Sequence, residues 1–595
     1  MSTAHLLLMS LGPVQDFIAQ ARRTRDLWFG SHVLSELSLE AARTAQRLRA
    51  ELIFPAFVDG QEAAPSVPNK LLVLVRQGEP REVARAAREA ARTRLREWGL
   101  EVWRKHPQLV DPGALGTAQE QLDTLLEFHA AWCPFTTPEE YPRALRLAEA
   151  ALAERKRLRP FSPWQHQRGG RHKSSLDGAR ESVLREGRRE GGDWRRFRIG
   201  QREELDAIGL LKRTGGQPGQ FIPVPTIGLA AYTALAKHTQ PPAMERLRRE
   251  CVRLRDQGVL TPVQAGDREW VRDFPFDAQL LLPGRWSTYL EEQGMGRQDA
   301  ERFGQDFVRP LLATLGEPFP YVACLVADGD KMGETLHALA SHGPAAHQSL
   351  SRTLSDFATE ARRILEERHR GVLVYAGGDD VLGFVCLPDA LSCAAELSRA
   401  FAAAMEQELQ SRAGVNAPTL SVGLGVGHVL ESLGDLLDLG RRAEQLAKGE
   451  DRNGFALLAR LRSGREHAWR QRWPDGPVKA LEDTITLRKA GTLPMTKVRD
   501  VSTALRRIPR HAGSPQDEAR WRPMLVGEVR RVLARVEAGT PGAGLTPQQA
   551  GLDLKEEGTL EELHVQVEAW AERVFLAELL SRATLRPRGD TRGAA

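Results

Sequence analysis

Acidic residues stand at the ends of two apolar segments, in the motifs ADGDKMG (327–333) and AGGDD (376–380). Two carboxylates held ~4 Å apart repel by roughly 4 kcal/mol at an effective dielectric of about 20. Asp328 would therefore lie beside Asp379 or Asp380 only with a cation between them, and such hard oxygen ligands suit Mg²⁺ or Mn²⁺. We interpret these three carboxylates as a metal site that holds a nucleoside triphosphate.

Taken alone, the Gly-Gly-Asp-Asp motif has a plain structural explanation. Between two β-rich runs it is typical of a tight hairpin turn, because glycine and aspartate tolerate positive φ. The upstream motif favours chemistry instead, since an apolar strand ends in Asp-Gly-Asp and runs into an expected helix. Backbone N–H groups of 329–333 would then point at an anion, helped by the positive end of the helix dipole.

The composition excludes several classes of protein. With 595 residues the chain is too long for one core, and we expect about three to five domains. Lysine and arginine (83) slightly exceed aspartate and glutamate (78), for a formal charge of +5, which permits a nucleic-acid partner without demonstrating one. Five scattered cysteines form no CxxC pair, which argues against a disulfide framework and against structural zinc. No leader or long apolar stretch stands out, so we expect a soluble, cytoplasmic protein without membrane contact.

Strand and helix patterns indicate an α+β fold. A strand at 5–12, an amphipathic helix and a strand at 70–75 open the chain, and long helices are expected from 81 to 157. Strand, helix and strand return at 320–386, in the β-α-β-β-α-β order of ferredoxin-like palm domains. The expected domains are a first sheet domain with a helical extension (1–157), an irregular, basic and helical domain (158–315), a second sheet domain (316–463) and a C-terminal helical domain (464–595).

Several stretches together resemble the large palm-containing subunit of type III-B (Cmr-type) CRISPR effector complexes. They are SLGPVQDFIAQARRTRDLWFGSHVLSEL (10–37) with VPNKLLVLV (67–75), the two acidic motifs, and SVGLGVGH (421–428) with AKGEDRNG (447–454). The opening stretch separates this family from diguanylate cyclases. The resemblance implies two ferredoxin-like palm domains (nucleotidyl cyclase/polymerase-like) that face each other, plus helical domains. It also implies a nucleotidyltransferase that converts ATP to cyclic oligoadenylates when guide RNA pairs with target RNA.

The resemblance assigns roles to individual residues of the second palm, the one it implies to be active. Asp328, Asp379 and Asp380 would be catalytic and bind Mg²⁺ or Mn²⁺ together with the carbonyl of Gly329. Asp330 could be a further metal ligand or could cap a turn, and Lys448 could be an ordinary cation at a helix end. The residues expected to contact nucleotide are Gly329, Asp330, Lys331, Met332, Gly333, Gly377, Gly378, Lys448 and Ser31.

The first palm lacks an acidic pair, because Leu11-Gly12-Pro13-Val14-Gln15 fills the position of the Asp-Gly-Asp turn. It is expected to be the wall that presents a second ATP. Ser31 and Ser35 would touch that nucleotide, unless they are plain serines on a helix surface. The cationic cluster of Arg22, Arg23 and Arg25 would face either phosphate or solvent.

Two departures from the family pattern matter. The chain begins directly at the palm and has no His-Asp dipeptide, so we expect no HD nuclease activity. The positions of two CxxC pairs hold Ser174, Asp177, Asp206 and Gly209, so zinc is not expected and packing alone should hold this module.

The implied partners are the other Cmr subunits, guide CRISPR RNA and target RNA. A catalytically idle scaffold that binds ATP only as structure is the alternative, and the intact Asp379-Asp380 pair favours the enzyme over it. A free-standing GGDEF-type dinucleotide cyclase fits less well, because of the N-terminal stretch and the long helical C-terminus.

Overall fold

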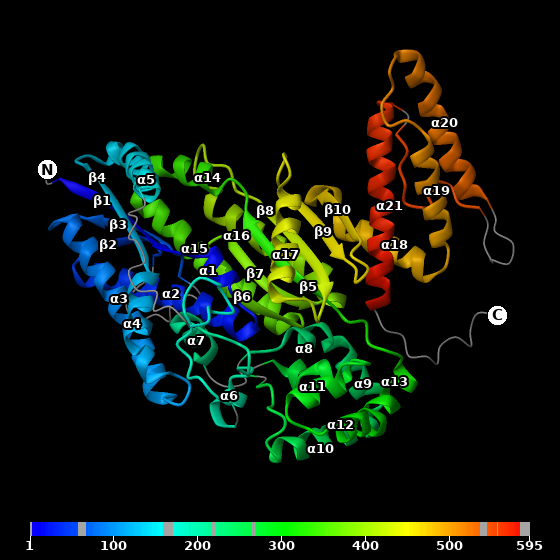
Figure 1. Ribbon diagram of the computed structural model, residues 1–595. Coiled ribbons are helices and arrows are strands. Elements are labelled where there is room, and N and C mark those ends of the chain that lie inside the picture. Colours follow the sequence, from blue (N-terminus) through cyan, green and yellow to red (C-terminus); the bar gives the residue numbers. More distant parts are fainter. Residues whose placement is uncertain are drawn as a thin grey trace.

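The computed structural model describes residues 3–56, 67–158, 171–189, 191–216, 221–264, 266, 268–535, 544–555 and 557–583. Two sheets, each with its own helices, form the body of the molecule (Figure 1). A mostly helical module lies along one side of both sheets, and a bundle of C-terminal helices stands at the far end from the N-terminus.

The first sheet has the strand order β2-β3-β1-β4, which is that of a ferredoxin-like domain. Its first strand is an apolar run that is buried almost throughout, with Leu6 to Met9 inaccessible to solvent. The elements are β1 (Ala4–Gly12), α1 (Gln15–Ala19), α2 (Thr24–Arg47), β2 (Glu51–Phe54), β3 (Lys70–Val75), α3 (Pro80–Lys105), α4 (Leu115–Leu125), β4 (Glu127–Phe135) and α5 (Tyr141–Arg157).

The second sheet has the order β10-β9-β8-β5-β7-β6, so β6, β7, β5 and β8 repeat the order of the first sheet. Strand β9 runs parallel to β8 and extends the sheet. The elements are β5 (Tyr321–Gly329), α14 (Met332–Leu339), α15 (Pro344–Arg363), β6 (Gly371–Gly377), β7 (Asp380–Cys386), α16 (Ala390–Leu409), β8 (Leu420–His428), α17 (Leu433–Lys448), β9 (Gly454–Arg460) and β10 (Glu466–Arg472). By this order α2 and β2 of the first sheet domain correspond to α15 and β6 of the second.

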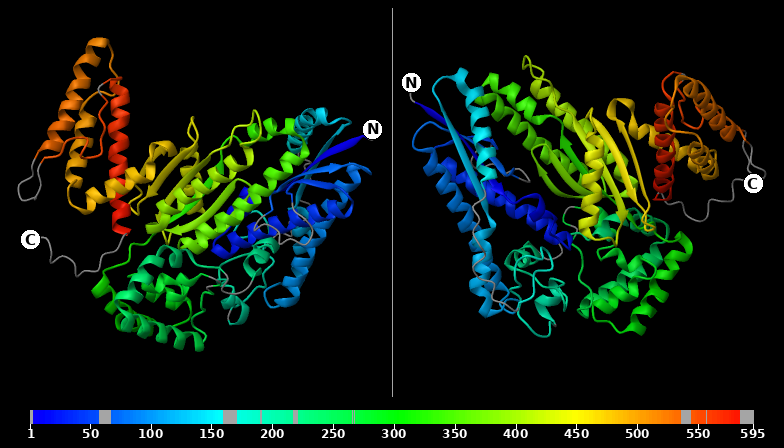
Figure 2. Two further views of the ribbon diagram at one scale, coloured as in Figure 1. Left: turned by 180° about the vertical axis from the view of Figure 1, so that it is seen from behind. Right: turned by 45° about the horizontal axis from the view of Figure 1, so that its top comes forward.

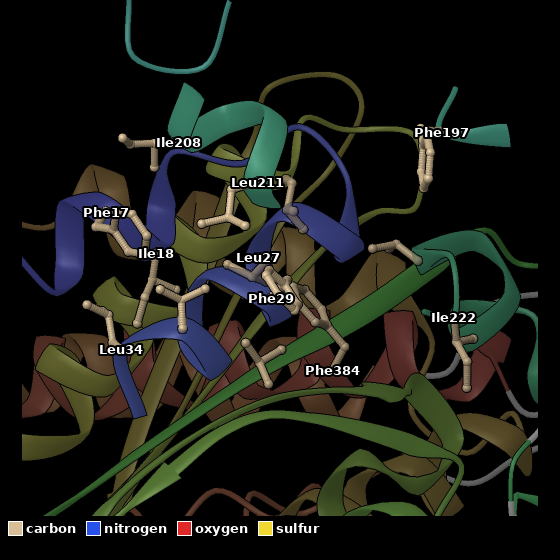
Figure 3. Packing of buried hydrophobic residues seen from close by; sticks show 14 of the residues in the cluster. Phe17, Ile18, Leu27, Phe29, Leu34, Phe197, Ile208, Leu211, Ile222 and Phe384 are labelled. Atoms are coloured by element: carbon tan, nitrogen blue, oxygen red, sulfur yellow. The ribbon is translucent and has the colours of Figure 1, made fainter. Parts of the chain in front are cut away.

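The two sheet domains contact each other reciprocally. Helix α2 packs against β6, and the corresponding helix α15 packs against β2, so the pair has an approximate two-fold relation. The backbone N–H of Ala56, just after β2, donates to Ser351 Oγ on α15 at 2.8 Å. On the same helix His347 Nδ1 lies 2.7 Å from the hydroxyl of Tyr141. One hydrophobic cluster spans this contact and contains Phe29 of α2 and Phe384 of β7 (Figure 3).

The module that lies between the two sheet domains in the sequence consists of short helices and irregular segments, as its weak periodicity predicted. The isolated bridge between Val110 and Leu184 ties it to the first sheet domain. Its helices are α6 (Gly192–Arg196), α7 (Ala207–Thr214), α8 (Val224–Gly228), α9 (Ala230–Thr239), α10 (Pro241–Asp256), α11 (Trp286–Glu292), α12 (Arg297–Phe303) and α13 (Arg309–Leu315).

The C-terminal helices have a core of their own and project away from the two sheets (Figure 2). They are α18 (Pro477–Lys489), α19 (Met495–Arg507), α20 (Pro515–Ala534) and α21 (Leu560–Ala583). The end of α21 returns to the second sheet domain, where Leu576 and Leu580 join its core. None of the helices in the described ranges combines the length and the apolar composition needed to cross a bilayer.

Two stretches expected to be helical contain strands. Residues 127–135 form β4 within the stretch expected to hold only helices, and residues 466–472 form β10, beyond the expected end of the second sheet domain at 463. Both strands lie at a sheet edge and have many exposed side chains, so neither carries a long apolar run.

Candidate functional site

The acidic motifs meet at one end of the second sheet. Strands β5 and β7 are antiparallel neighbours, and Ala327 pairs with Val381, so Asp328 comes opposite Asp380. The two carboxyl groups hydrogen-bond to each other. The structure therefore brings together Asp328 and Asp380, which the sequence had placed on separate strands.

Asp379 reaches the same place because residue 329 is glycine. A Cβ at Gly329 would lie 2.7 Å from the Cβ of Asp379 and 2.8 Å from its Oδ2, so any side chain there would displace the carboxylate. Gly378 has a φ of +71°, as a tight turn requires. The Gly-Gly-Asp-Asp motif is thus a hairpin turn between β6 and β7 that also positions carboxylates.

Lys448, the last residue of α17, completes this group. Its Nζ lies 2.5 Å from Asp328 Oδ2 and 2.6 Å from Glu444 Oε1. Helix α17 can approach β8 closely because β8 carries glycines on that face: a Cβ at Gly423 would lie 2.1 Å from the backbone nitrogen of Glu444. The glycine-rich sequence of β8 therefore places Lys448 beside the carboxylates.

Too little positive charge lies near Asp328, Asp379 and Asp380 for all three carboxylates to be ionised at once. Burial and the charge of Asp328 raise the pKa of Asp379 to about 7. Desolvation by the surrounding protein raises the pKa of Asp380 to about 9, together with the hydrogen bond to Asp328 and the charge of Asp379. Asp380 is exposed at the start of β7, so the neighbouring carboxylates raise its pKa more than desolvation does. Partial burial opposes ionisation of Asp328, but hydrogen bonds with Asp380 and Lys448 outweigh it and lower that pKa.

This donor set fits a divalent cation of the Mg²⁺ or Mn²⁺ type. Hard carboxylate oxygens come from two adjacent strand ends, and the Lys448 ammonium contacts one of them. In the described ranges, however, no group of three His, Cys, Asp or Glu side chains is arranged so that it could hold a metal ion as it stands. Binding would require the carboxylates to rearrange.

Asp330 stabilises a turn, which is one of the two roles expected for it, and the other was to bind metal. It is 3% exposed, and its carboxylate accepts hydrogen bonds from Ser421 Oγ at 2.8 Å and Thr419 Oγ1 at 2.7 Å. The backbone N–H of Asn453 donates to it at 3.0 Å. Asp330 therefore joins the end of β5 to the ends of β8 and β9, and its carboxylate is occupied by these hydrogen bonds, against the expectation that it contacts nucleotide.

The expected phosphate loop leads directly into α14. Lys331 has a φ of 58° and an exposed side chain 3.4 Å from Glu334, and Met332 begins the helix. The first N–H groups of any helix lack acceptors within it, so the start of α14, including Gly333, presents donors beside Asp328. Gly377 lies in the same turn region, at the end of β6.

Ser31 and Ser35 lie inside the contact between the two sheet domains, so the idea of plain surface serines is wrong. Both are buried, and Ser35 Oγ accepts from the backbone N–H of Val67 at 2.5 Å. Together with Tyr375 and Ala376 of β6 they line a cavity of about 20 Å³, which is about the size of a water molecule. A nucleotide could enter here only if the two domains moved apart.

Tyr375 is a neighbour of the site that sequence reasoning missed. Burial raises the pKa of its hydroxyl, and so do the nearby charges of Asp380 and Asp379. The only sequence signal was an aromatic residue two positions before the glycine pair. The phenol therefore lies between the carboxylate turn and helix α2.

The four positions of the expected lost zinc site converge, but packing alone does not hold them. Ser174 Oγ and the backbone N–H of Gly209 each donate to Asp206 at 3.0 Å. Arg180 lies 2.8 Å from Asp177 and 4.0 Å from Asp206, so its guanidinium supplies positive charge between two carboxylates. The expectation of packing alone was therefore wrong, since hydrogen bonds and ion pairs connect these positions.

Two family models match the sheet domains. Residues 321–456 match the model described as Cas10/Cmr2, second palm domain, and residues 6–100 match CRISPR-associated protein Cmr2, N-terminal. A curated relative, the CRISPR system Cmr subunit Cmr2 of Pyrococcus furiosus, is 22% identical over 76% of this chain. The match spans 61% of the length of that relative.

Solved structures of type III-B Cmr-beta show the same fold. A chain of the apo state matches with a TM-score of 0.62 and 11% identity, over 95% of this chain and 81% of that one. A chain of Cmr-beta bound to cognate target RNA matches with a TM-score of 0.63 and 12% identity, over 91% and 80%. Residues 6–100 and 321–456 of this chain are therefore similar in sequence to the Cas10/Cmr2 family models, and the chain shares the fold of the Cmr-beta chains.

Proposed function

We propose that this chain is the large subunit of a type III-B CRISPR effector ribonucleoprotein and that its second palm is a nucleotidyltransferase that makes cyclic oligoadenylates from ATP. The observation that carries the proposal is the pairing of Asp328 with Asp380 at adjacent strand ends, with Asp379 held against Gly329. The names of the matched proteins support two of the proposed partners, other Cmr subunits and target RNA. Guide RNA is the third proposed partner.

The site's own residues would bind and orient the substrate. Asp328, Asp379 and Asp380 would hold a divalent ion, whose chemistry when bound is to stabilise charge on the attacking and leaving oxygens. The N–H groups at the start of α14 would contact the phosphates, as would Lys448 and Lys331. A ribose hydroxyl of one ATP would then form a bond to the α-phosphorus of another, pyrophosphate would leave, and the hydroxyl proton would pass to solvent.

Lys448 would change partner when the triphosphate binds. Without ligand its ammonium neutralises Asp328 at 2.5 Å. A cation on the carboxylates would remove the need for that ion pair and allow the ammonium to turn to a phosphate oxygen. The same lysine would thus neutralise Asp328 and, after this change of partner, hold the substrate.

The test is product formation by the assembled complex. Wild-type complex is incubated with ATP, Mg²⁺ or Mn²⁺ and matched target RNA, and the products are identified by mass. The double change Asp379→Ala and Asp380→Ala should abolish oligoadenylates and leave assembly intact. Asp256→Ala, at an exposed helix end, is a matched control that should keep activity. Oligoadenylates from the double variant would remove these carboxylates from the mechanism.

An idle nucleotide-binding scaffold is the second candidate, and two observations favour it. The Lys448–Asp328 ion pair neutralises the site without metal, and no ready-made metal cluster exists in the described part of the chain. The same assay separates the two candidates. ATP binding without any product under matched target RNA would identify the scaffold.

A further inference from the structure

An arginine-rich cavity of about 510 Å³ lies away from the carboxylates. Its walls come from the start of α2, from the segment around Arg198, and from Val429 and Leu433 after β8. Strand β8 ends where β5 begins, since His428 pairs with Tyr321, whereas the carboxylates are at the opposite end of β5. At about 3.4 Å per residue, the two sites are separated by roughly 27 Å along the strand.

Positive charge predominates around this cavity. The carboxylates that line it are Asp277, which pairs with Arg198 at 3.2 Å, and Glu431, which pairs with Arg460 at 2.9 Å. The arginines that line it are Arg22, Arg23, Arg25, Arg196, Arg198, Arg213 and Arg285. The excess of positive charge at the cavity walls therefore favours the binding of an anion.

One buried guanidinium at the cavity has an N–H group with no acceptor. Arg213 is fully buried, and it binds Asp26 at 2.6 and 2.8 Å and Glu203 at 2.8 Å. Its Nη1 has no hydrogen-bond partner among the described residues, and neither has the buried Nε of Arg23. Leaving a buried charged donor unpaired costs free energy, so these N–H groups add to the excess of positive charge and unused donors at this wall.

Contacts within the protein hold the residues of the cavity wall in place. Asp26, which fixes Arg213, also accepts the backbone N–H groups of Arg22 and Arg23 at 3.1 Å, so the first turn of α2 is held in place. Arg25 lies 5.2 Å from the ring centre of Phe197 and 4.8 Å from that of Phe221.

Like charges are held together here against their repulsion. Burial and the charge of Arg213 lower the pKa of Arg23. Burial also lowers the pKa of Arg25, to about 10. The first N–H groups of α2, a helix of 24 residues, add positive potential at the same point.

We propose that this cavity binds the phosphate groups of a nucleotide, either of a free nucleoside polyphosphate or of the phosphorylated end of a single RNA strand. Arginines bind phosphate oxygens in a bidentate manner, and several of them line this one cavity. The volume lies within the range of small-molecule sites, about 300–1,000 Å³, and exceeds what one inorganic phosphate needs. The site is separate from the carboxylate site and does not depend on the function proposed for that site.

Binding by the full chain tests the proposal. The probes are ATP and a ten-nucleotide RNA with either a 5′-triphosphate or a 5′-hydroxyl, all in EDTA so that no metal loads the carboxylates. The variant Arg22→Glu with Arg196→Glu changes two exposed wall residues. Its matched control, Arg297→Glu with Arg302→Glu, makes the same charge change at the exposed helix α12.

We expect the wall variant to bind at least one phosphorylated probe tenfold or more weakly, and the control to bind as the wild type does. Preference for ATP identifies a free nucleotide as the ligand, and preference for the triphosphorylated RNA identifies a strand end. Equal affinity of wild type and wall variant for every probe would overturn the proposal, as would an equal loss in the control. If a polyglutamate peptide bound as tightly as the phosphorylated probes and lost as much affinity in the wall variant, the assignment to a nucleotide would be overturned.

Discussion

The two sheet domains share a strand order but differ at one strand end. Strands β1 and β5 each have nine residues and end in glycine, so Leu11 of the first corresponds to Asp328 of the second. Leu11 is buried, whereas Asp328 meets Asp380 and Lys448. The comparison teaches that the palm fold supplies positions and that chemistry depends on which side chains occupy them.

The reciprocal contact gives the first palm a different task. Helix α2 brings Ser31 against Tyr375 of β6, beside the carboxylate turn, and no acidic pair stands at the end of β1. The first palm thus supplies a wall and the second supplies the carboxylates. Four substitutions would break or sharpen this contrast.

The largest effect is expected from Asp328→Asn. It removes a charged oxygen ligand, and ligand loss should exceed the roughly 10- to 100-fold effects seen when supporting groups are removed. We expect oligoadenylate formation by the assembled complex to fall roughly a hundredfold or more, with unchanged melting temperature. Activity within a few-fold of wild type would mean that the second palm does not differ from the first in the way proposed.

The converse change, Leu11→Asp, should not create activity and should destabilise the first palm. Leu11 is 1% exposed, and an unpaired carboxylate there would cost about 3 kcal/mol. Thermal unfolding followed by fluorescence would measure the loss, with Leu11→Met as a volume-matched control. A variant as stable as wild type would show that this strand end tolerates charge as β5 does.

Asp330→Ala separates structural from chemical carboxylates within one turn. It leaves the donors of Ser421, Thr419 and Asn453 without their acceptor, at a cost of about 2 kcal/mol. A lowered melting temperature is expected, in contrast to Asp328→Asn. If Asp330→Ala melted like wild type, the turn-stabilising role would be refuted.

The smallest effect concerns the contact between the palms. Burial lowers the pKa of His347, which is hydrogen-bonded to Tyr141 and Leu336. The unfolded chain therefore binds more protons than the native one as pH falls below the ordinary value of 6.5, and stability should decline in that range. His347→Gln should flatten the dependence of melting temperature on pH between about 7 and 5. Identical pH profiles for the variant and wild type would contradict this.

Local patterns in the sequence predicted much of the second palm. The apolar runs of β5, β6 and β7 are buried strands, and the two motifs mark their ends. The sequence alone therefore predicts that the carboxylates lie at strand ends. Strand β10 could not, because an edge strand such as EHAWRQR buries one face only. Its polar residues look like those of a solvated helix.

Contacts between distant residues were beyond sequence reasoning. The pair of Asp26 and Arg213 joins residues 187 positions apart, and the arginine-rich cavity is lined by segments that are distant in the sequence. Lys448 was expected near phosphate, but its ion pair with Asp328 depends on how closely α17 approaches β8. That approach follows from glycines whose packing partners lie elsewhere in the chain.

The most direct test of the account is a structure of the chain with Mn²⁺ and a non-hydrolysable ATP analogue. We predict an anomalous manganese peak in contact with Asp328, Asp379 and Asp380, and triphosphate at the start of α14 with Lys448 moved onto it. A nucleotide bound elsewhere, with Lys448 still on Asp328 and no metal at the carboxylates, would contradict the account.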